Sequence, residues 1–268
     1  MNQARRIAIL PLILALQTAR AVALPAPLPC GNGCGGCWVP SPVTSWQWQL
    51  QGTIDQSVDV ALYDIDLFDV SADVVGALHA AGRHVVCYLD AGTWENWRPD
   101  AGQYPSEVLG HSNGWPGEKW LDIRRLDVLT PLLRTRLDLC RSKGFDGVEF
   151  DNVDGYANTT GFPLTADDQL TFNVWLANEA HARHLNAALK NDLDQVSTLL
   201  PYFDWALDEQ CFQYQECAQL LPFVQAGKAV MEVEYSLKTG RFCAQANTLN
   251  FNAMKKNLAL DVPRTPCR

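Results

Sequence analysis

Four acidic side chains lie within one short segment, 144–155, which reads Gly-Phe-Asp-Gly-Val-Glu-Phe-Asp-Asn-Val-Asp-Gly. Successive side chains of a β-strand point to opposite faces, so Glu149 and Asp151 would share one face while Val148 and Phe150 occupy the other. Because strand interiors disfavour acids, such a strand is either exposed at a sheet edge or carries acids with a function. The flanking glycines delimit the segment, and its apolar residues indicate a buried face. We interpret it as the carboxyl end of a barrel strand that presents catalytic acids.

Several other predicted strands also end in acidic or polar residues. These residues are Asp64, Asp66, Asp90, Lys190, Asn191, Asp192, Asp208, Glu209, Glu234 and Tyr235. In a barrel of parallel strands the carboxyl ends meet at one rim, where the active site lies. A single acid at a strand end is often only a helix cap or a loop acceptor, which stays open for Asp64 and Asp90. The convergence of several acids favours a catalytic site.

Paired carboxylates at such a rim suit glycoside hydrolysis. One carboxyl group protonates the leaving oxygen, and the other acts as nucleophile or activates water. The same oxygens could hold a divalent cation, and 151–155 faintly resembles a cation-binding loop. The chain lacks the spaced Asp/Asn series and terminal Glu of an EF-hand, so we predict no metal site. No serine-hydrolase or nucleotide-binding motif is present, and we predict no cofactor.

Nine tryptophans provide a second indication of a sugar ligand. Sugar rings have apolar faces that stack on aromatic rings, and an amino sugar would add a cation–π interaction. About half of these tryptophans are expected to be simply packed in the protein. We predict that Trp46 and Trp94 bind substrate.

The elements that would position these residues alternate between strand-like and helix-like stretches. Eight strands are predicted at 46–50, 58–63, 84–89, within 144–155, and at 185–190, 203–209, 229–235 and 251–254. Helices are predicted at 72–81, 128–143 and 166–183, the second ending at a C′ glycine, Gly144. Strands separated by helices imply βαβ units and a parallel sheet. Eight strands without an internal break favour an α/β fold of the (β/α)8 TIM-barrel type over an open doubly wound sheet.

The N-terminus has the pattern of an export signal. Arg5 and Arg6 precede an apolar run over 7–16, and the small residues Ala21-Val22-Ala23 follow. The run is about half of the ~20 residues needed to span a bilayer, so a retained anchor is the weaker interpretation. We therefore predict a signal peptide over 1–23, a Cys/Gly/Pro-rich leader over 24–44 and one barrel domain over 45–268. The mature protein would be secreted, monomeric and free of the membrane.

The net charge and the cysteine content fit a secreted protein. Cleavage after Ala23 removes three arginines and no acid, so the net charge moves from −9 to −12. An acidic protein is a poor ligand for nucleic acid or anionic membrane and suits a cationic substrate. The nine cysteines can oxidise after export. Cys211 with Cys217, and Cys243 with Cys267, are spaced to close loops, whereas zinc binding remains an alternative for the cluster at Cys30, Cys34 and Cys37.

Longer blocks of sequence resemble one enzyme family. These blocks are Ser45–Leu50, Cys87–Gly92, Gly114–Arg124, Gly144–Gly155, Leu189–Asp192, Leu207–Cys211 and Val233–Tyr235. In their order and content they are similar to the endo-α-1,4-polygalactosaminidases, glycoside hydrolase family 114. The resemblance extends from about Ser45 to the C-terminus.

The resemblance implies a (β/α)8 barrel that cleaves α-1,4-linked galactosamine in a galactosaminogalactan-type polysaccharide. It implies Asp151 as nucleophile and Glu209 as acid/base, in a retaining reaction. The predicted substrate-binding residues are Asp64, Asp90, Glu149, Asn152, Asp154, Lys190, Glu234, Tyr235, Trp46 and Trp94. One departure lies in the central segment, where Glu149-Phe150 replaces the Asp-Pro common in the family. Two alternatives stay open: a non-catalytic carbohydrate-binding barrel, and a hydrolase of another α-linked glycan.

Overall fold

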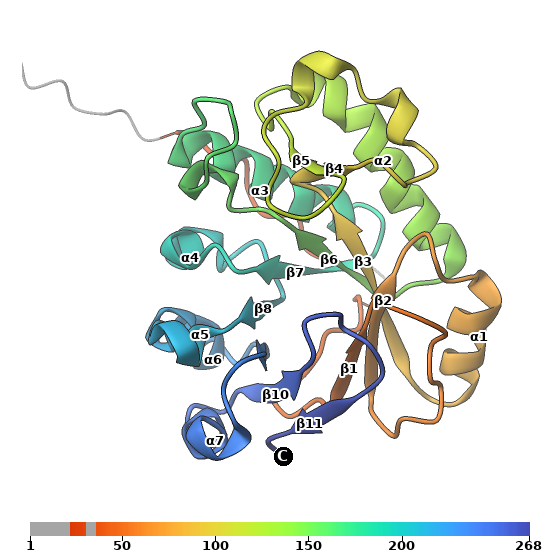
Figure 1. Ribbon diagram of the computed structural model, residues 1–268, viewed down its shortest axis with the longest axis vertical. Helices are drawn as coiled ribbons and strands as arrows, with labels where there is room; N and C mark the ends of the chain where they lie inside the picture. Colours follow the sequence, from red (N-terminus) through yellow and green to blue (C-terminus); the bar gives the residue numbers. More distant parts are fainter. Residues whose placement is uncertain (1–21, 31–35) are drawn as a thin grey trace, which may run out of the picture.

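The computed structural model describes residues 22–30 and 36–268. Its main sheet has nine strands in the order β1-β2-β3-β6-β7-β8-β9-β10-β11, of which all but β11 run parallel to their neighbours. The strands are β1 Trp46–Gln49, β2 Leu62–Asp66, β3 His84–Asp90, β6 Gly147–Asp151, β7 Asn186–Lys190, β8 Trp205–Glu209, β9 Val230–Glu234, β10 Asn252–Lys256 and β11 Arg264–Pro266. The sheet curls into a single-domain (β/α)8 barrel (Figure 1), as the sequence predicted.

The barrel is completed between β10 and β1 by bonds outside the parallel ladder. β11 pairs antiparallel with β10. Between β1 and β10, the indole Nε1 of Trp46 donates a hydrogen bond to the backbone carbonyl oxygen of Asn252 at 2.8 Å. The side-chain amide of Gln47 donates to the backbone carbonyl oxygen of Val262 at 2.7 Å. The segment after β10 therefore takes the place of direct β1–β10 pairing.

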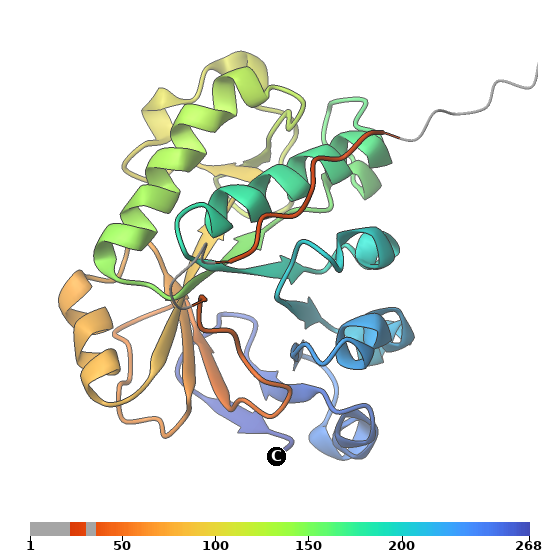
Figure 2. The same cartoon turned by 180° about the vertical axis from the view of Figure 1, so that it is seen from behind.

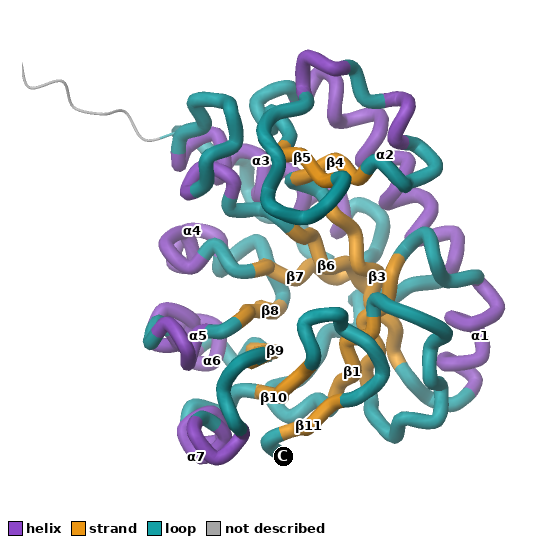
Figure 3. The backbone as a smooth tube through the Cα atoms, in the orientation of Figure 1, coloured by secondary structure: helices purple, strands orange, loops and turns teal. Residues whose placement is uncertain are grey.

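Helices surround the strands (Figure 3). They are α1 Ala72–Ala80, α2 Leu126–Lys143, α3 Ala166–His181, α4 Val196–Leu199, α5 Cys211–Tyr214, α6 Leu221–Gln225 and α7 Cys243–Thr248. The three longest match the predicted helices to within two residues, because their ends carry strong signals. Thr165 and Asp168 form a capping box at the start of α3, and Gly144, with φ of 93°, ends α2.

The two faces of the strands serve two different cores. Inward-facing side chains of the lower barrel, among them Trp46, Trp205 and Met254, form one apolar cluster. Outward-facing side chains such as Val148 and Phe150 pack in a larger cluster with the helices. The central strand is therefore buried on both faces, and Glu149 at 0 % exposure lies inside the barrel rather than at a sheet edge.

A two-stranded hairpin rises above the barrel between β3 and α2. It consists of β4 Thr93–Glu95 and β5 Glu118–Trp120, paired antiparallel. The sequence predicted only a long tryptophan-containing loop here. The hairpin lies at the carboxyl end of the strands, where Glu95, Glu118 and Trp120 form one wall of a cleft.

Residues 22–30 of the leader lie along α3 on the outside of the barrel (Figure 2). Tyr202 donates from its hydroxyl to the carbonyl of Pro25, and the amide of Leu28 donates to the side chain of Asn178. The ring of Trp38 stacks on His84 at 3.8 Å between centroids. The predicted signal peptide lies almost wholly outside the described residues.

Four disulfides link the described cysteines: Cys30–Cys37, Cys87–Cys140, Cys211–Cys217 and Cys243–Cys267. The last two confirm the pairs suggested by spacing, and Cys34 lies outside the described residues. Of the helices described, none has the length and apolar character needed to cross a bilayer.

Candidate active site

Lys190 lies between the two predicted catalytic carboxylates at the carboxyl rim of the barrel. Its Nζ is 2.8 Å from Oδ1 of Asp151 and 3.1 Å from Oε2 of Glu209. Lys190 itself is buried, whereas the side chains of Asp151 and Glu209 keep 20 % and 25 % of their surface exposed. The two acids therefore share one cation and face the same open space.

Asp151 is held in its ionised form. Burial raises the pKa of its carboxyl, but the Lys190 ammonium and a 2.8 Å hydrogen bond from the Tyr88 hydroxyl outweigh burial, and the pKa is lowered overall. The Asn152 amide adds a third hydrogen bond, at 2.8 Å. An ionised, oriented carboxylate is what a glycosidase nucleophile requires.

Glu209, at the end of β8, is oriented by neighbours on both sides. The hydroxyl of Tyr235 donates to its Oε1, and its backbone amide donates to Oδ1 of Asn191 at 3.1 Å. Glu209 thus has one oxygen on Tyr235 and the other beside Lys190. This geometry places its carboxyl within reach of the space above Asp151.

Two further acids lie under Lys190 inside the barrel. Oε1 of Glu149 is 3.4 Å from the Lys190 Nζ, and both Glu149 and Asp64 are fully buried. Burial raises the pKa of Glu149 to about 7, with Lys190 opposing this and Asp151 adding to it. Burial and the Glu149 charge raise the pKa of Asp64 well above its usual range. These two groups, which were predicted to bind substrate, lie below Lys190 and do not line the cleft.

The space above Asp151 and Glu209 is a cleft of about 680 Å³, a size typical of ligand sites. Its aromatic lining comes from Trp48, Tyr88, Trp97, Trp115, Trp120 and Tyr235. Trp97 and Trp115 are each 52 % exposed, on the hairpin side. The segment 258–260 also lines the cleft.

The cleft lining contains many more acids than bases. Seven carboxylate residues line it: Asp66, Asp69, Glu95, Glu118, Asp151, Asp154 and Glu209. Among the described lining residues the bases are Lys190 and Arg98, and both are ion-paired. Arg98 contacts Asp66 through two nitrogens, at 2.9 and 2.6 Å, and Glu95 at 2.6 Å. The remaining charge of the cleft is negative.

Half of the predicted site residues line this cleft. They are Asp151, Glu209, Asn152, Asp154, Lys190 and Tyr235. The others are located elsewhere. Asp90 is buried and accepts hydrogen bonds from the Thr93 amide and hydroxyl and from the Asn152 side chain at 2.8 Å. It braces two loops that approach so closely that a side chain at Gly92 would collide with the Asn152 backbone.

Glu234, Trp46 and Trp94, which were predicted to bind substrate, also lie outside the cleft lining. Glu234 faces outward from β9, where its Oε1 accepts the amides of Phe212 and Gln213 at the start of α5. Trp46 is 2 % exposed within the lower barrel. The Trp94 indole donates to the carbonyl of Ala101 at 3.0 Å, and its ring does not line the cleft.

Some residues that shape the site were not predicted from the sequence. Tyr88, Trp48 and Arg98 line the cleft, and the Lys190 ammonium lies 5.0 Å from the Trp48 ring centroid. The alternation of side chains along a strand could have indicated two of them. Tyr88 lies on the same strand face as Asp90, and Trp48 lies on the same face as Trp46. Arg98 has one partner close in sequence, Glu95, but its other partner, Asp66, is distant, so no local pattern places Arg98 at the cleft.

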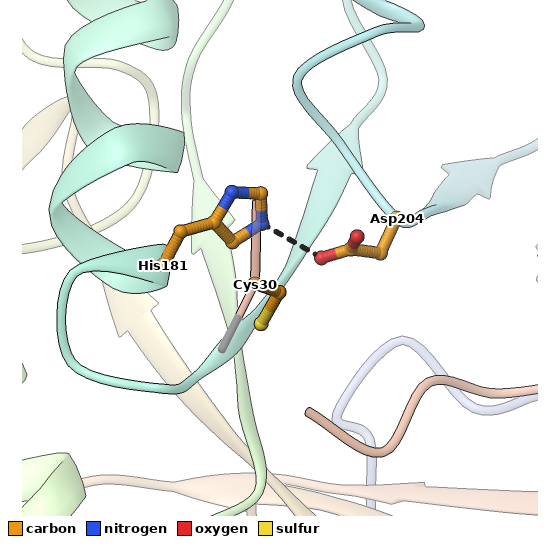
Figure 4. Close-up of side chains that lie close together, drawn as sticks. All are labelled: Cys30, His181 and Asp204. Carbon is orange, nitrogen blue, oxygen red and sulfur yellow. Dashed lines mark hydrogen bonds and ion pairs between the residues drawn. The ribbon is translucent and has the colours of Figure 1, made fainter. Parts of the chain in front are cut away.

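Two groups of described residues have the donor types of a metal site, but their atoms are engaged otherwise. In the first, Nε2 of His181 lies 2.8 Å from Oδ2 of Asp204 beside Cys30 (Figure 4), whose sulfur is in a disulfide. The other His181 nitrogen bonds the carbonyl of Leu28 at 2.7 Å. This group therefore anchors the leader. In the second, formed by Asp90, Glu95 and Glu118, each carboxylate accepts protein hydrogen bonds.

Comparison with known proteins agrees with this geometry. The family model of "Glycoside-hydrolase family GH114" matches residues 33–268. The crystal structure of Ega3 from Aspergillus fumigatus in complex with galactosamine is 40 % identical, covers 88 % of this chain and 100 % of its own, and superposes with a TM-score of 0.82. No curated protein matched the chain.

More distant structures share the fold alone. The glycoside hydrolase domain of PelA from Pseudomonas aeruginosa is 13 % identical, covers 82 % of this chain and 96 % of its own, and has a TM-score of 0.64. The α-galactosidase TtGalA from Thermus thermophilus, solved with stachyose, is 12 % identical over 85 % of this chain and 64 % of its own, with a TM-score of 0.56. The family match over most of the chain, together with two carboxylates at the barrel rim, shows that this protein belongs to glycoside-hydrolase family GH114.

Proposed function

We propose that this protein is a secreted endo-α-1,4-polygalactosaminidase, which hydrolyses α-1,4-linked galactosamine in a galactosaminogalactan-type polysaccharide. The observation that carries the proposal is the Asp151–Lys190–Glu209 arrangement at the floor of an acidic cleft. It occurs in a chain 40 % identical to a protein crystallised with galactosamine. The four disulfides fit an oxidising destination outside the cell.

The proposed reaction proceeds in two steps. The Asp151 carboxylate attacks the anomeric carbon while Glu209 protonates the departing glycosidic oxygen, which forms a covalent glycosyl–Asp151 ester and releases the leaving sugar. Glu209, now ionised, then takes a proton from water, whose oxygen attacks the same carbon and frees Asp151. Lys190 remains charged throughout and keeps Asp151 a carboxylate before attack.

The spacing of the acids supports retention of configuration. Both oxygens lie within 3.1 Å of one nitrogen, so they can be no more than about 6 Å apart. This separation is below the range of roughly 6.5–9.5 Å that leaves room for water in inverting enzymes.

The charge of the cleft supports a cationic sugar. Deacetylated galactosamine carries an ammonium group, which interacts favourably with the unpaired carboxylates of the lining. Trp97 and Trp115 offer exposed rings on which the apolar faces of successive sugars can stack. An uncharged glycan of the same linkage would use the rings but not the acids.

The test is to incubate the purified enzyme with deacetylated and with N-acetylated galactosaminogalactan and to identify products by mass spectrometry. Galactosamine oligomers released only from the deacetylated polymer are the expected result. Products from the acetylated polymer alone, or from neither, would contradict the proposal. Asp59→Gly is a suitable protein control, since Asp59 is exposed on a loop before β2 and lines neither described pocket.

A further inference from the structure

A second pocket of about 360 Å³ adjoins the cleft on the Glu209 side. Asp154, Asn191 and Glu209 line both spaces, whereas Asp151 lines only the main cleft. The loops that follow β7 and β8 form most of this side pocket. Its position means that a chain lying across Asp151 and Glu209 can continue into it.

The lining of the side pocket is strongly acidic. Six carboxylate residues line it: Asp154, Asp192, Asp194, Asp208, Glu209 and Glu216. None of its described lining residues is Lys, Arg or His. Any anion would be repelled, and a cation would find no competing internal partner.

Asp208 is the most informative of these acids. It is 1 % exposed, and its Oδ1 has no hydrogen-bond partner within the described part of the chain. A buried carboxyl oxygen without a partner is costly, which points to a ligand that supplies a donor. Asp192 repeats the pattern, since its Oδ2 accepts from Asn173 at 2.8 Å while its Oδ1 has no described partner.

The acids of the side pocket raise one another's pKa values. Burial raises the pKa of Asp208 well above its usual range, and the nearby Glu216 and Glu209 charges add to it. Burial, with Asp154 adding, likewise raises the pKa of Asp192 to about 8. A bound ammonium group would offset the repulsion within this set.

The pocket also offers an aromatic surface. Tyr214, at the end of α5, lines it and is 61 % exposed. An exposed ring beside carboxylates matches an amino sugar, which has an apolar ring face and a charged nitrogen. A bare metal ion would use the acids and have no need of the ring.

We propose that the side pocket is the subsite for the leaving-group side of the substrate and binds one galactosamine unit, with Asp208 as the partner of its ammonium group and Tyr214 as its stacking surface. The assignment to the leaving side rests on the proposed function, in which Glu209 protonates the departing oxygen. The sugar that leaves must therefore lie on the Glu209 side, where this pocket is.

Binding to an inactive protein tests the proposal without hydrolysis. Asp151→Asn removes the proposed nucleophile and leaves the side pocket unchanged. Calorimetry on this background should show that Asp208→Asn weakens binding of a galactosamine oligomer by about tenfold or more, as expected for a lost hydrogen bond to a charged group. Glu216→Gln should weaken it less, and neither change should affect the N-acetylated oligomer.

Asp59→Asn is the matched control, because it removes one negative charge from an exposed loop away from both pockets. Thermal unfolding shows whether the Asp208→Asn protein is folded. If it is not, the binding measurements on Glu216→Gln and Tyr214→Ala test the proposal instead. Equal affinity in all pocket variants, equal weakening of the acetylated oligomer by Asp208→Asn or Glu216→Gln, or no binding of the cationic oligomer would overturn the proposal.

The outcome is separable from that of the proposed function. If the wild type does not cleave the polymer but binding of the cationic oligomer depends on Asp208, the proposed function fails and the pocket assignment to an amino sugar stands. If the polymer is cleaved but Asp208→Asn does not change the affinity for the cationic oligomer, the pocket assignment fails and the proposed function stands.

Discussion

The ammonium nitrogen of Lys190 lies 2.8 Å from Oδ1 of Asp151, in a position where almost none of the lysine side chain is exposed. Burial alone would lower the pKa of this lysine, but Asp151, Glu209 and Glu149 together raise it well above its usual range. The lysine is therefore a permanent charge, and it keeps Asp151 ionised.

Replacing Lys190 by Met should lower kcat by roughly 10²-fold or more, the usual effect of removing one preorganised electrostatic group. Without the ammonium, the pKa of Asp151 rises, because burial is then opposed only by hydrogen bonds. The acidic limb of the kcat/KM profile should therefore move to higher pH. Lys238→Met, at an exposed lysine outside both described pockets, is the control. An unchanged acidic limb in a folded Lys190→Met protein would refute this role.

Replacing Tyr88 by Phe removes only the hydroxyl that donates to Asp151. A single hydrogen bond contributes about 0.5–1.5 kcal/mol, so kcat/KM should fall by about tenfold or less, with a smaller shift of the acidic limb in the same direction. Tyr63→Phe is matched to it, because the Tyr63 hydroxyl donates to the backbone carbonyls of Val58 and Asp55. The control should lose stability without moving the pH profile. If both variants moved it equally, Tyr88 would have only a structural role.

Much of the barrel could be predicted from the sequence, because its strands and three long helices carry local signals. The apolar run at 84–89 and the Gly144 stop are examples, and β3 and α2 lie there. The second strand was predicted too early, at 58–63 rather than Leu62–Asp66. Val58 lies before the strand, where its backbone carbonyl accepts a hydrogen bond from the Tyr63 hydroxyl.

It was harder to predict which acids line the cleft. This depends on which face of its strand each side chain occupies and on how far along the barrel axis it lies. Glu234 and Tyr235 are adjacent in sequence, so their side chains point to opposite faces of the strand. Glu234 therefore contacts the start of α5, whereas Tyr235 contacts Glu209. Asp64 and Asp151 share the barrel interior at different depths, so one is beneath Lys190 and the other above. The Cys87–Cys140 disulfide spans 53 residues, and only the packing of α2 on β3 brings the pair together.

Glu149 should make the protein less stable as the pH rises. Its pKa is about 7 in the folded protein against 4.5 for an ordinary glutamate, so the folded state binds the proton more tightly. Stability attributable to this group is full below about pH 4.5 and is lost as pH rises through about 7, by up to about 3 kcal/mol. Urea unfolding at several pH values measures this loss.

The Glu149→Gln variant should flatten that dependence, because glutamine does not titrate. Glu179→Gln is the contrast, since Arg134 and Arg183 outweigh burial and lower the pKa of Glu179. An equally steep loss of stability between pH 4.5 and 7 in Glu149→Gln would show that other groups cause it.

His181 should anchor the leader without affecting catalysis. Replacing it by Ala removes the contacts to Leu28 and Asp204 and should lower the free energy of unfolding by about 1–3 kcal/mol. Limited proteolysis should then cut within 22–30 faster than in the wild type. His79→Ala, at a histidine with a partly exposed side chain on α1, should leave this cleavage unchanged. A leader equally resistant in both variants would contradict the anchoring role.

The central claim is that Asp151 and Glu209 together cleave galactosamine linkages, and the initial rate of polymer cleavage by Asp151→Asn and Glu209→Gln tests it most directly. With circular dichroism showing both variants folded, each should lose roughly 10³-fold or more of the wild-type rate on deacetylated polymer. Cleavage at the wild-type rate by either folded variant would contradict the account.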